Sequence, residues 1–160
     1  MDWVGSLAVS VVGGGVAALI TVWLSLRQFY QQRWWERKLD AYTAIVDALH
    51  HMKNAADADY WEELDVEKLS PEERAKVNAK YAEAKAEILR LTDMGELIFS
   101  AEAIAELRLL FKKMAARQES YYEHLENSLA AVNDCLDRFK PIAKRDLELT
   151  RTWLPWQRKN

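Results

Sequence analysis

The chain has 160 residues, of which 22 are lysine or arginine and 25 are aspartate or glutamate, so its formal net charge is −3. This balance gives no overall positive field and argues against binding to a nucleic-acid duplex. The single cysteine, Cys135, excludes an intrachain disulfide and is typical of a reducing compartment.

The first element is an uncharged stretch over residues 3–26. At about 1.5 Å per residue, a helix of this length covers roughly the 30 Å hydrocarbon core of a bilayer. We therefore predict a transmembrane helix over residues 1–28. A cleaved signal peptide is the alternative, but such a peptide begins with basic residues, whereas this chain begins Met1-Asp2.

The flanks of this stretch predict its orientation. Arginine and lysine follow its C-terminal end and are missing before it, so the positive-inside bias places residues 27–160 in the cytoplasm of a single-pass protein. Aromatic and basic residues at the two ends suit the membrane interface, or alternatively subunit contacts at a pore mouth. The candidate interface residues are Trp3, Trp23, Arg27, Arg33, Trp34, Trp35, Arg37 and Lys38.

One face of the predicted span carries only small or polar residues at helical spacing. They are Ser6, Ser10, Gly14, Ala17, Thr21, Ser25 and Gln28. Small side chains allow close packing of membrane helices, so this stripe predicts a homodimer or larger homo-oligomer. A second interpretation is that several copies place the stripe around a central axis, where its hydroxyl groups line a pore.

Beyond the span, periodicity predicts helices and no strand. A row with steps of three and four extends to about Tyr60: Trp35, Leu39, Tyr42, Val46, Leu49 and Ala56, broken only by Lys53. Eight acidic residues and three basic ones then fill residues 57–76, which we interpret as an acidic connection far from the membrane.

The next helix begins at a capping box, Ser70-Pro71-Glu72-Glu73. Its apolar row is Val77, Tyr81, Ala84, Ile88 and Leu91. We expect it to end at Gly95, with that residue in the left-handed conformation.

A third helix is predicted from Ser100 to Lys140, with a change of heptad phase at Gln118 that indicates a kink or a change of supercoil. Its apolar rows are Ile104, Leu107, Phe111 and Met114, then Tyr122, Leu125, Leu129, Val132, Leu136 and Phe139. Pro141 should end or bend it, and a short last helix to about Trp153 should follow.

These elements predict an all-α fold in which the transmembrane helix continues into a cytosolic up-and-down helical bundle or an extended coiled coil. The bundle covers residues 29–140, and the helices could pack within one chain or between chains. Residues 141–160 form a basic, tryptophan-containing C-terminal segment. Its candidate contacts with a ligand or with lipid are Lys144, Arg145, Arg151, Trp153, Trp156 and Arg158.

No pattern in the sequence indicates catalysis. His50 and His51 are adjacent and have no metal-ligating residue three or four positions further on, so we predict no metal site. No activated nucleophile or phosphate-binding glycine loop is recognisable outside the span, and we expect neither an enzyme nor a cofactor.

The plan of the chain resembles a known class of protein. One N-terminal span, the junction Arg-Trp-Trp-Glu-Arg-Lys-Leu-Asp-Ala-Tyr (residues 33–42) and a cytosolic helical domain are similar to small single-span bacterial effectors of anti-phage defence, most nearly the transmembrane effector of the Hailong type. This resemblance implies an inner-membrane homo-oligomer that opens as an ion channel when a nucleotide signal binds. The alternative function is a non-conducting anchor or scaffold that recruits a cytosolic partner protein.

Overall fold

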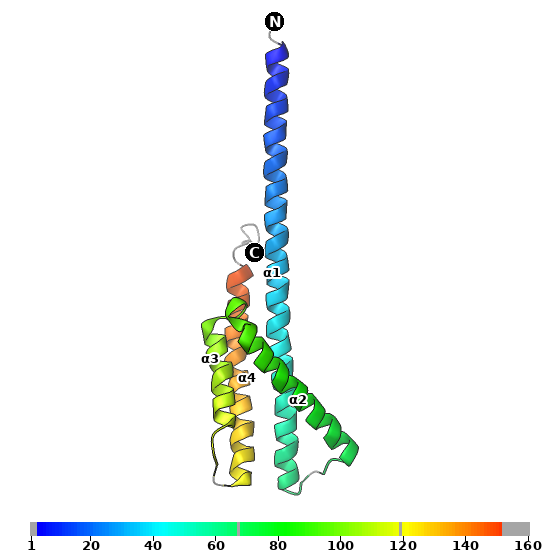
Figure 1. Cartoon of the computed structure of the whole chain (residues 1–160), viewed down its shortest axis with the longest axis vertical. Helices are drawn as coiled ribbons and strands as arrows, with labels where there is room; N and C mark the ends of the chain where they lie inside the picture. Colours follow the sequence, from blue (N-terminus) through cyan, green and yellow to red (C-terminus); the bar gives the residue numbers. More distant parts are fainter. Residues whose placement is uncertain (1–2, 67, 119, 152–160) are drawn as a thin grey trace, which may run out of the picture. The chain divides into compact units, whose positions relative to one another are not determined.

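The computed structural model describes the backbone of residues 3–66, 68–118 and 120–151, and the side chains of residues 20–66, 68–95, 97–118 and 120–148. Every regular element among these residues is a helix, and none is a strand. Figure 1 shows the helices α1 (Trp3–Glu63), α2 (Pro71–Met94), α3 (Ala101–Met114) and α4 (Tyr121–Arg151), with a short 3₁₀ turn, η1 (Gly95–Leu97), after α2. The predicted all-α class is confirmed.

The chain forms two compact units, residues 1–37 and residues 38–160. In the part of the chain that the structure describes, no helix is both long and apolar enough to cross a membrane. The predicted transmembrane helix, residues 1–28, falls largely on residues 1–19, whose side chains lie outside the described part.

The second unit is an up-and-down bundle. Tyr42, near the start of this part of α1, contacts Asp146 near the end of α4, and Tyr60 contacts Tyr122 at the start of α4, so these two helices run antiparallel. Helices α3 and α4 form an antiparallel hairpin (Figure 1). The bundle therefore forms within one chain.

Apolar side chains from all four helices meet in one core. The largest fully buried ones are Tyr42, Ile45, Leu49, Met52, Ile88, Leu107, Leu110, Val132 and Phe139. The predicted rows identified most of them, because burial of a helix face requires apolar residues every three or four positions. Ile45 and Met52, however, lie outside the predicted row of α1, and Val46 in that row is only half-buried.

The capping box that begins α2 is confirmed. The Glu73 backbone N–H donates to Ser70 Oγ at 3.3 Å, and the Ser70 N–H donates to Glu73 Oε2 at 3.0 Å. At the other end, the expected left-handed Gly95 is wrong, since its φ is −73° and the chain turns into η1. Close packing instead favours glycine here, because a Cβ would lie 2.9 Å from Cδ2 of Phe99.

The predicted continuous helix from Ser100 to Lys140 is wrong, although its start is confirmed. The chain leaves α3 after Met114 and reverses before α4. The change of heptad phase at Gln118 thus marks a reversal of direction. Ser120 begins α4, and its Oγ accepts from the Glu123 N–H at 3.1 Å.

Of the two alternatives predicted for Pro141, an end of the helix is wrong, because α4 continues through this residue to Arg151. Proline removes the hydrogen bond to the carbonyl group of Asp137, but both residues are exposed and water can solvate that carbonyl. Phe139, Ile142 and Ala143 are buried in the core, and their packing offsets the lost bond.

Candidate functional site

Three members of the small-residue stripe have described side chains, and all three are exposed in the single chain. They are Thr21, Ser25 and Gln28. The Ser25 hydroxyl donates to the Thr21 carbonyl oxygen at 2.8 Å, so its proton is satisfied within its own helix. The remaining members, Ser6, Ser10, Gly14 and Ala17, have side chains outside the described residues.

The basic and aromatic residues that follow the stripe pair along the helix axis. The guanidinium of Arg27 lies 5.5 Å from the ring centroid of Trp23, and that of Arg33 lies 5.3 Å from the ring centroid of Phe29. Such cation–π pairs four residues apart hold an apolar ring next to a charge. This is the arrangement expected where apolar chains meet charged headgroups.

Large apolar side chains remain exposed along this part of α1. Each is between 45% and 69% exposed: Ile20, Val22, Trp23, Leu24, Leu26, Phe29, Tyr30 and Trp34. At about 100° per residue, the first five span roughly 200° of the helix circumference, and Thr21 and Ser25 lie in the remaining arc. Covering only one face of the helix would therefore leave part of this apolar surface in water.

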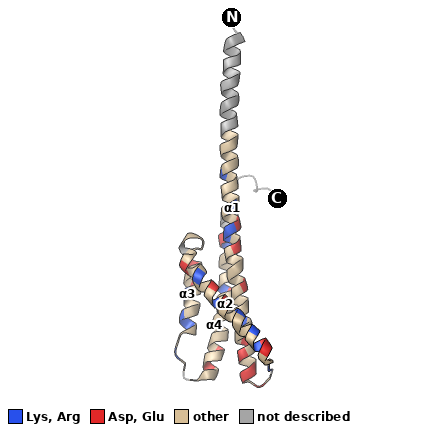
Figure 2. Ribbon diagram, turned by 45° about the vertical axis from the view of Figure 1, so that its right-hand side comes forward, with Lys and Arg blue, Asp and Glu red and all other residues tan. Residues whose placement is uncertain are grey.

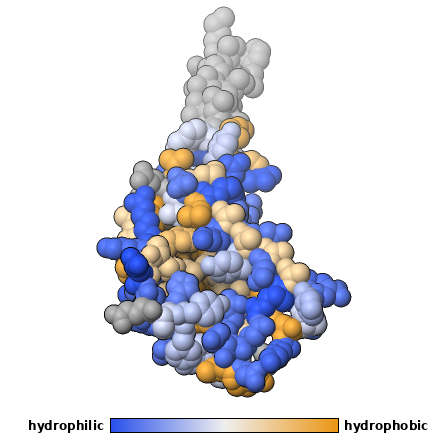
Figure 3. All heavy atoms as spheres, turned by 60° about the horizontal axis from the view of Figure 1, so that its bottom comes forward, coloured by the Kyte–Doolittle hydropathy of each residue, from blue (hydrophilic) through white to orange (hydrophobic). Residues whose placement is uncertain are grey.

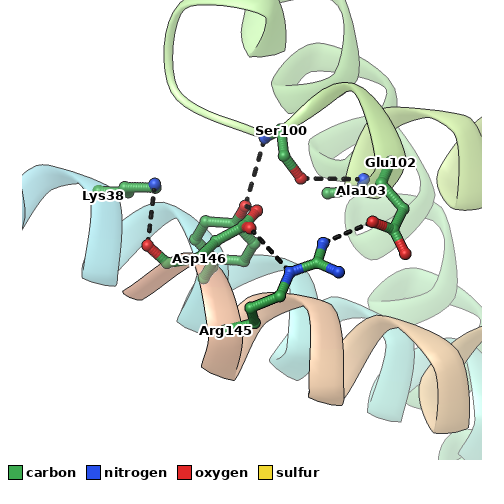
Figure 4. Close-up of polar contacts among 7 residues, drawn as sticks. Lys38, Ser100, Glu102, Ala103, Arg145 and Asp146 are labelled. Atoms are coloured by element: carbon green, nitrogen blue, oxygen red, sulfur yellow. Dashed lines mark hydrogen bonds and ion pairs between the residues drawn. The ribbon is translucent and has the colours of Figure 1, made fainter. Parts of the chain in front are cut away.

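In the second unit, the structure brings Lys38 and Arg145 to one polar cluster (Figure 4). Lys38 Nζ donates to the Asp146 carbonyl oxygen at 3.2 Å. Arg145 Nη2 donates to Glu102 Oε2 at 2.5 Å, which links α4 to α3. The sequence assigned Lys38 to the membrane interface and Arg145 to a ligand or lipid, and these assignments stay predictions.

The centre of this cluster is a buried pair that the sequence analysis missed. The Tyr42 hydroxyl donates to Asp146 Oδ2 at 2.5 Å and accepts from the Ser100 N–H at 3.4 Å. Tyr42 is 1% exposed and Asp146 is 6% exposed. Asp146 lies one helical turn after Ile142 and Ala143, on the same face of the helix. An acidic residue in line with apolar ones was the sequence signal that could have indicated a buried carboxylate.

The pKa values of the pair follow from these contacts. Burial would raise the pKa of Asp146. Hydrogen bonds with Ser100 and Tyr42 act in the opposite direction. The positive charges of Lys38 and Arg145 add to them, so the net pKa of Asp146 lies below its ordinary value. Burial, followed by the bond to Asp146, raises the pKa of Tyr42 well above its ordinary value. The cluster therefore joins an ionised carboxylate to a neutral phenol.

The remaining candidate residues of the C-terminal segment are largely undescribed. Lys144 is exposed, and its Nζ lies 4.0 Å from Glu148 Oε1. The side chains of Arg151, Trp153, Trp156 and Arg158 lie outside the described residues.

The other reactive groups show no arrangement for catalysis among the described residues. Burial, with a contribution from Glu106, raises the pKa of the Cys135 thiol to about 12, so this thiol is protonated and shielded. His51 Nε2 lies 3.8 Å from Asp47, as a pair on one helix face. Across the described side chains, no three His, Cys, Asp or Glu residues come together in a way that could hold a metal ion.

Comparisons of the chain with protein-family models, with curated proteins and with solved structures find no match.

Proposed function

We propose that the chain is a membrane-anchored, homo-oligomeric helical effector whose N-terminal helices form a gated pore that disrupts the bacterial inner membrane in anti-phage defence. The observation that carries the membrane anchor is the broad apolar surface that α1 exposes between Ile20 and Trp34. Lipid on the outside and neighbouring copies on the inside would cover all of it.

The small-residue stripe supports self-association through the same helix. The side chains of Thr21 and Ser25 are short, so the backbones of neighbouring copies can approach closely. Ser25 satisfies its own proton within the helix, which lowers the free energy of placing it in an apolar environment. Its oxygen lone pairs still accept hydrogen bonds from water, as a pore lining requires.

The defence role and the trigger rest on the resemblance of residues 33–42 and of the overall plan to Hailong-type effectors. On that basis the partners are membrane lipid, further copies of the chain and a nucleotide signal. A non-conducting anchor or scaffold for a cytosolic partner protein is the second candidate, because small-residue stripes also serve packing alone.

The test is ion flux through liposomes that contain the full-length chain, with and without added ATP, cyclic nucleotides or extract of infected bacteria. Ser25→Arg charges the stripe, and Leu26→Arg places the same charge one residue further along, about 100° around the helix from Ser25 and outside the stripe. We expect flux in the unmodified chain, and Ser25→Arg should reduce cation flux at least about tenfold more than Leu26→Arg.

Equal effects of the two substitutions would contradict a pore lined by the stripe. Liposomes that hold oligomers and stay silent under every addition would favour the scaffold instead. Cross-linking of the reconstituted chain verifies that oligomers are present in both cases.

A further inference from the structure

The end of the second unit opposite Lys38 carries an exposed aromatic surface, here called the aromatic tip. It consists of Tyr60, Trp61, Leu64, Val66, Tyr121 and Tyr122. Trp61 is 44% exposed, Tyr121 63% and Val66 68%. Figure 3 views this end and shows apolar side chains among hydrophilic ones.

Three rings of the aromatic tip, those of Tyr60, Trp61 and Tyr122, hold one another in place. The ring centroids of Tyr60 and Tyr122 are 5.8 Å apart, and their hydroxyl oxygens are 3.0 Å apart. The Trp61 ring packs edge-on against Tyr60 at 5.4 Å. This packing joins the ends of α1 and α4 and orders the rings before any partner binds, which lowers the entropic cost of binding.

A hollow of about 210 Å³ adjoins the tip. Its lining consists of Asn54, Asp57, Ala58, Trp61 and Leu69. It therefore combines one aromatic wall with a carboxylate, which suits a side chain that has both an apolar stem and a positive head.

Acidic residues surround this surface. Residues 57–76 hold eight acids and three bases, and the ribbon in Figure 2 is red, for aspartate and glutamate, at the end of α1 and the start of α2. Arg74 pairs with Asp59 and Glu62 and so ties α2 to α1. Among the described residues, Asp57 and Glu63 have no ion-pair partner, and they leave negative charge for a partner to neutralise.

We propose that the aromatic tip docks a protein segment that presents arginine next to apolar side chains. Arginine stacks on Trp and Tyr rings and forms paired hydrogen bonds with carboxylates, and the tip offers both groups together. Apolar residues of the segment would cover Leu64 and Val66. This inference rests on the second unit alone and stands whether or not the membrane helices conduct.

Two other occupants fit the charge or the distance less well. Residues 152–160 of the same chain are basic, but they follow the end of α4 that lies far from the tip. The 31 residues of α4 rise ~46 Å, whereas nine extended residues reach at most ~32 Å, so this segment is too short to reach the tip. A second tip carries the same negative charge, so two tips repel each other.

The experiment measures the anisotropy of a fluorescein-labelled peptide in which arginine alternates with leucine, added to the full-length chain in nanodiscs of zwitterionic lipid. Empty nanodiscs give the background. Trp61→Ala should weaken binding about tenfold, because stacking and apolar contact are both lost. Its control is Leu97→Ala, which removes a side chain that is 81% exposed at the other end of the unit.

Charge is tested separately with Asp57→Asn/Glu63→Gln, against the control Glu83→Gln/Asp93→Asn on the exposed side of α2. Only the first pair of substitutions should weaken binding of the peptide and make that binding less dependent on salt concentration. Protection of Cys135 from thiol reagents verifies the fold of every variant.

The proposal is overturned if the peptide does not bind above background, if glutamate in place of arginine binds equally well, or if the tip and control variants behave alike. It is also overturned if Trp61→Ala dissociates the oligomer, because the tip would then contact a second copy. Tip-specific, salt-dependent binding in a chain that shows no ion flux would uphold this docking surface and reject the pore.

Discussion

At the residue scale, the buried pair Tyr42–Asp146 sets the geometry of one end of the bundle. The carboxylate connects α1 to α4 through Tyr42, and the Tyr42 hydroxyl in turn holds the Ser100 N–H at the start of α3. Phe99 packs edge-on against the Tyr42 ring with centroids 4.9 Å apart. Three segments, namely α1, α4 and the connection that leads into α3, therefore meet at these two side chains.

We expect Asp146→Ala to lower the free energy of unfolding by about 2 kcal/mol, because it leaves the buried Tyr42 hydroxyl without its acceptor. Asp137→Ala, on the exposed side of the same helix, should change it by less than about 0.5 kcal/mol. Urea unfolding followed by circular dichroism measures both. Equal values for the two variants would show that the pair contributes nothing to stability.

The same pair predicts a pH dependence. The pKa of Asp146 is lower in the folded chain than in the unfolded chain, so its contribution is complete above the ordinary pKa and disappears as the pH falls through the folded value. The difference in stability between the unmodified chain and Asp146→Asn should therefore shrink below about pH 4. A constant difference from pH 7 to pH 3 would contradict this assignment.

At the element scale, local interactions determine where the helices of this chain begin, whereas tertiary packing determines where they end. Ser70 and Ser100 could be identified from sequence because a cap acts on backbone groups only three residues away. Ser120-Tyr121-Tyr122-Glu123 has the same pattern and would have revealed the start of α4. The continuation of α4 through Pro141 could not be predicted from such local patterns, because it depends on the burial of Phe139 and Ile142 in the core.

Gly95 gives the prediction that belongs to this scale. Its φ is compatible with any residue, so Gly95→Ala should destabilise the chain through packing against Phe99, by about 1 kcal/mol. Thermal unfolding measures the loss. Phe99→Leu alone and combined with Gly95→Ala provides the control, because a smaller side chain at 99 should remove most of the added cost. A stabilised Gly95→Ala variant would show that the ring moves aside without cost.

At the scale of the whole molecule, the two units predict separable properties. The core residues lie between Ala41 and Ala143, so the stability of the second unit should not depend on the sequence of residues 3–26. We expect a chain with an unrelated polyleucine anchor in their place to keep the urea midpoint of the bundle and the protection of Cys135 from thiol reagents.

The same replacement should abolish ion flux, since the new helix lacks the hydroxyl groups of the stripe. Retained flux would contradict a pore lined by Thr21 and Ser25. A lowered urea midpoint would instead show that the bundle draws stability from the first unit.

The sequence by itself determined the all-α class, the starts of α2 and α3 and most of the core. Helical periodicity and caps arise from interactions between residues a few positions apart, so the amino-acid sequence alone is enough to recognise them. Only the tertiary structure decided the reversal between α3 and α4, the continuation of α4 through Pro141, and the meeting of Tyr42 with Asp146 and of Tyr60 with Tyr122. The two tyrosine contacts join residues more than 60 positions apart in the chain, and no local pattern encodes such a meeting. At Pro141, packing across the bundle outweighs local preference.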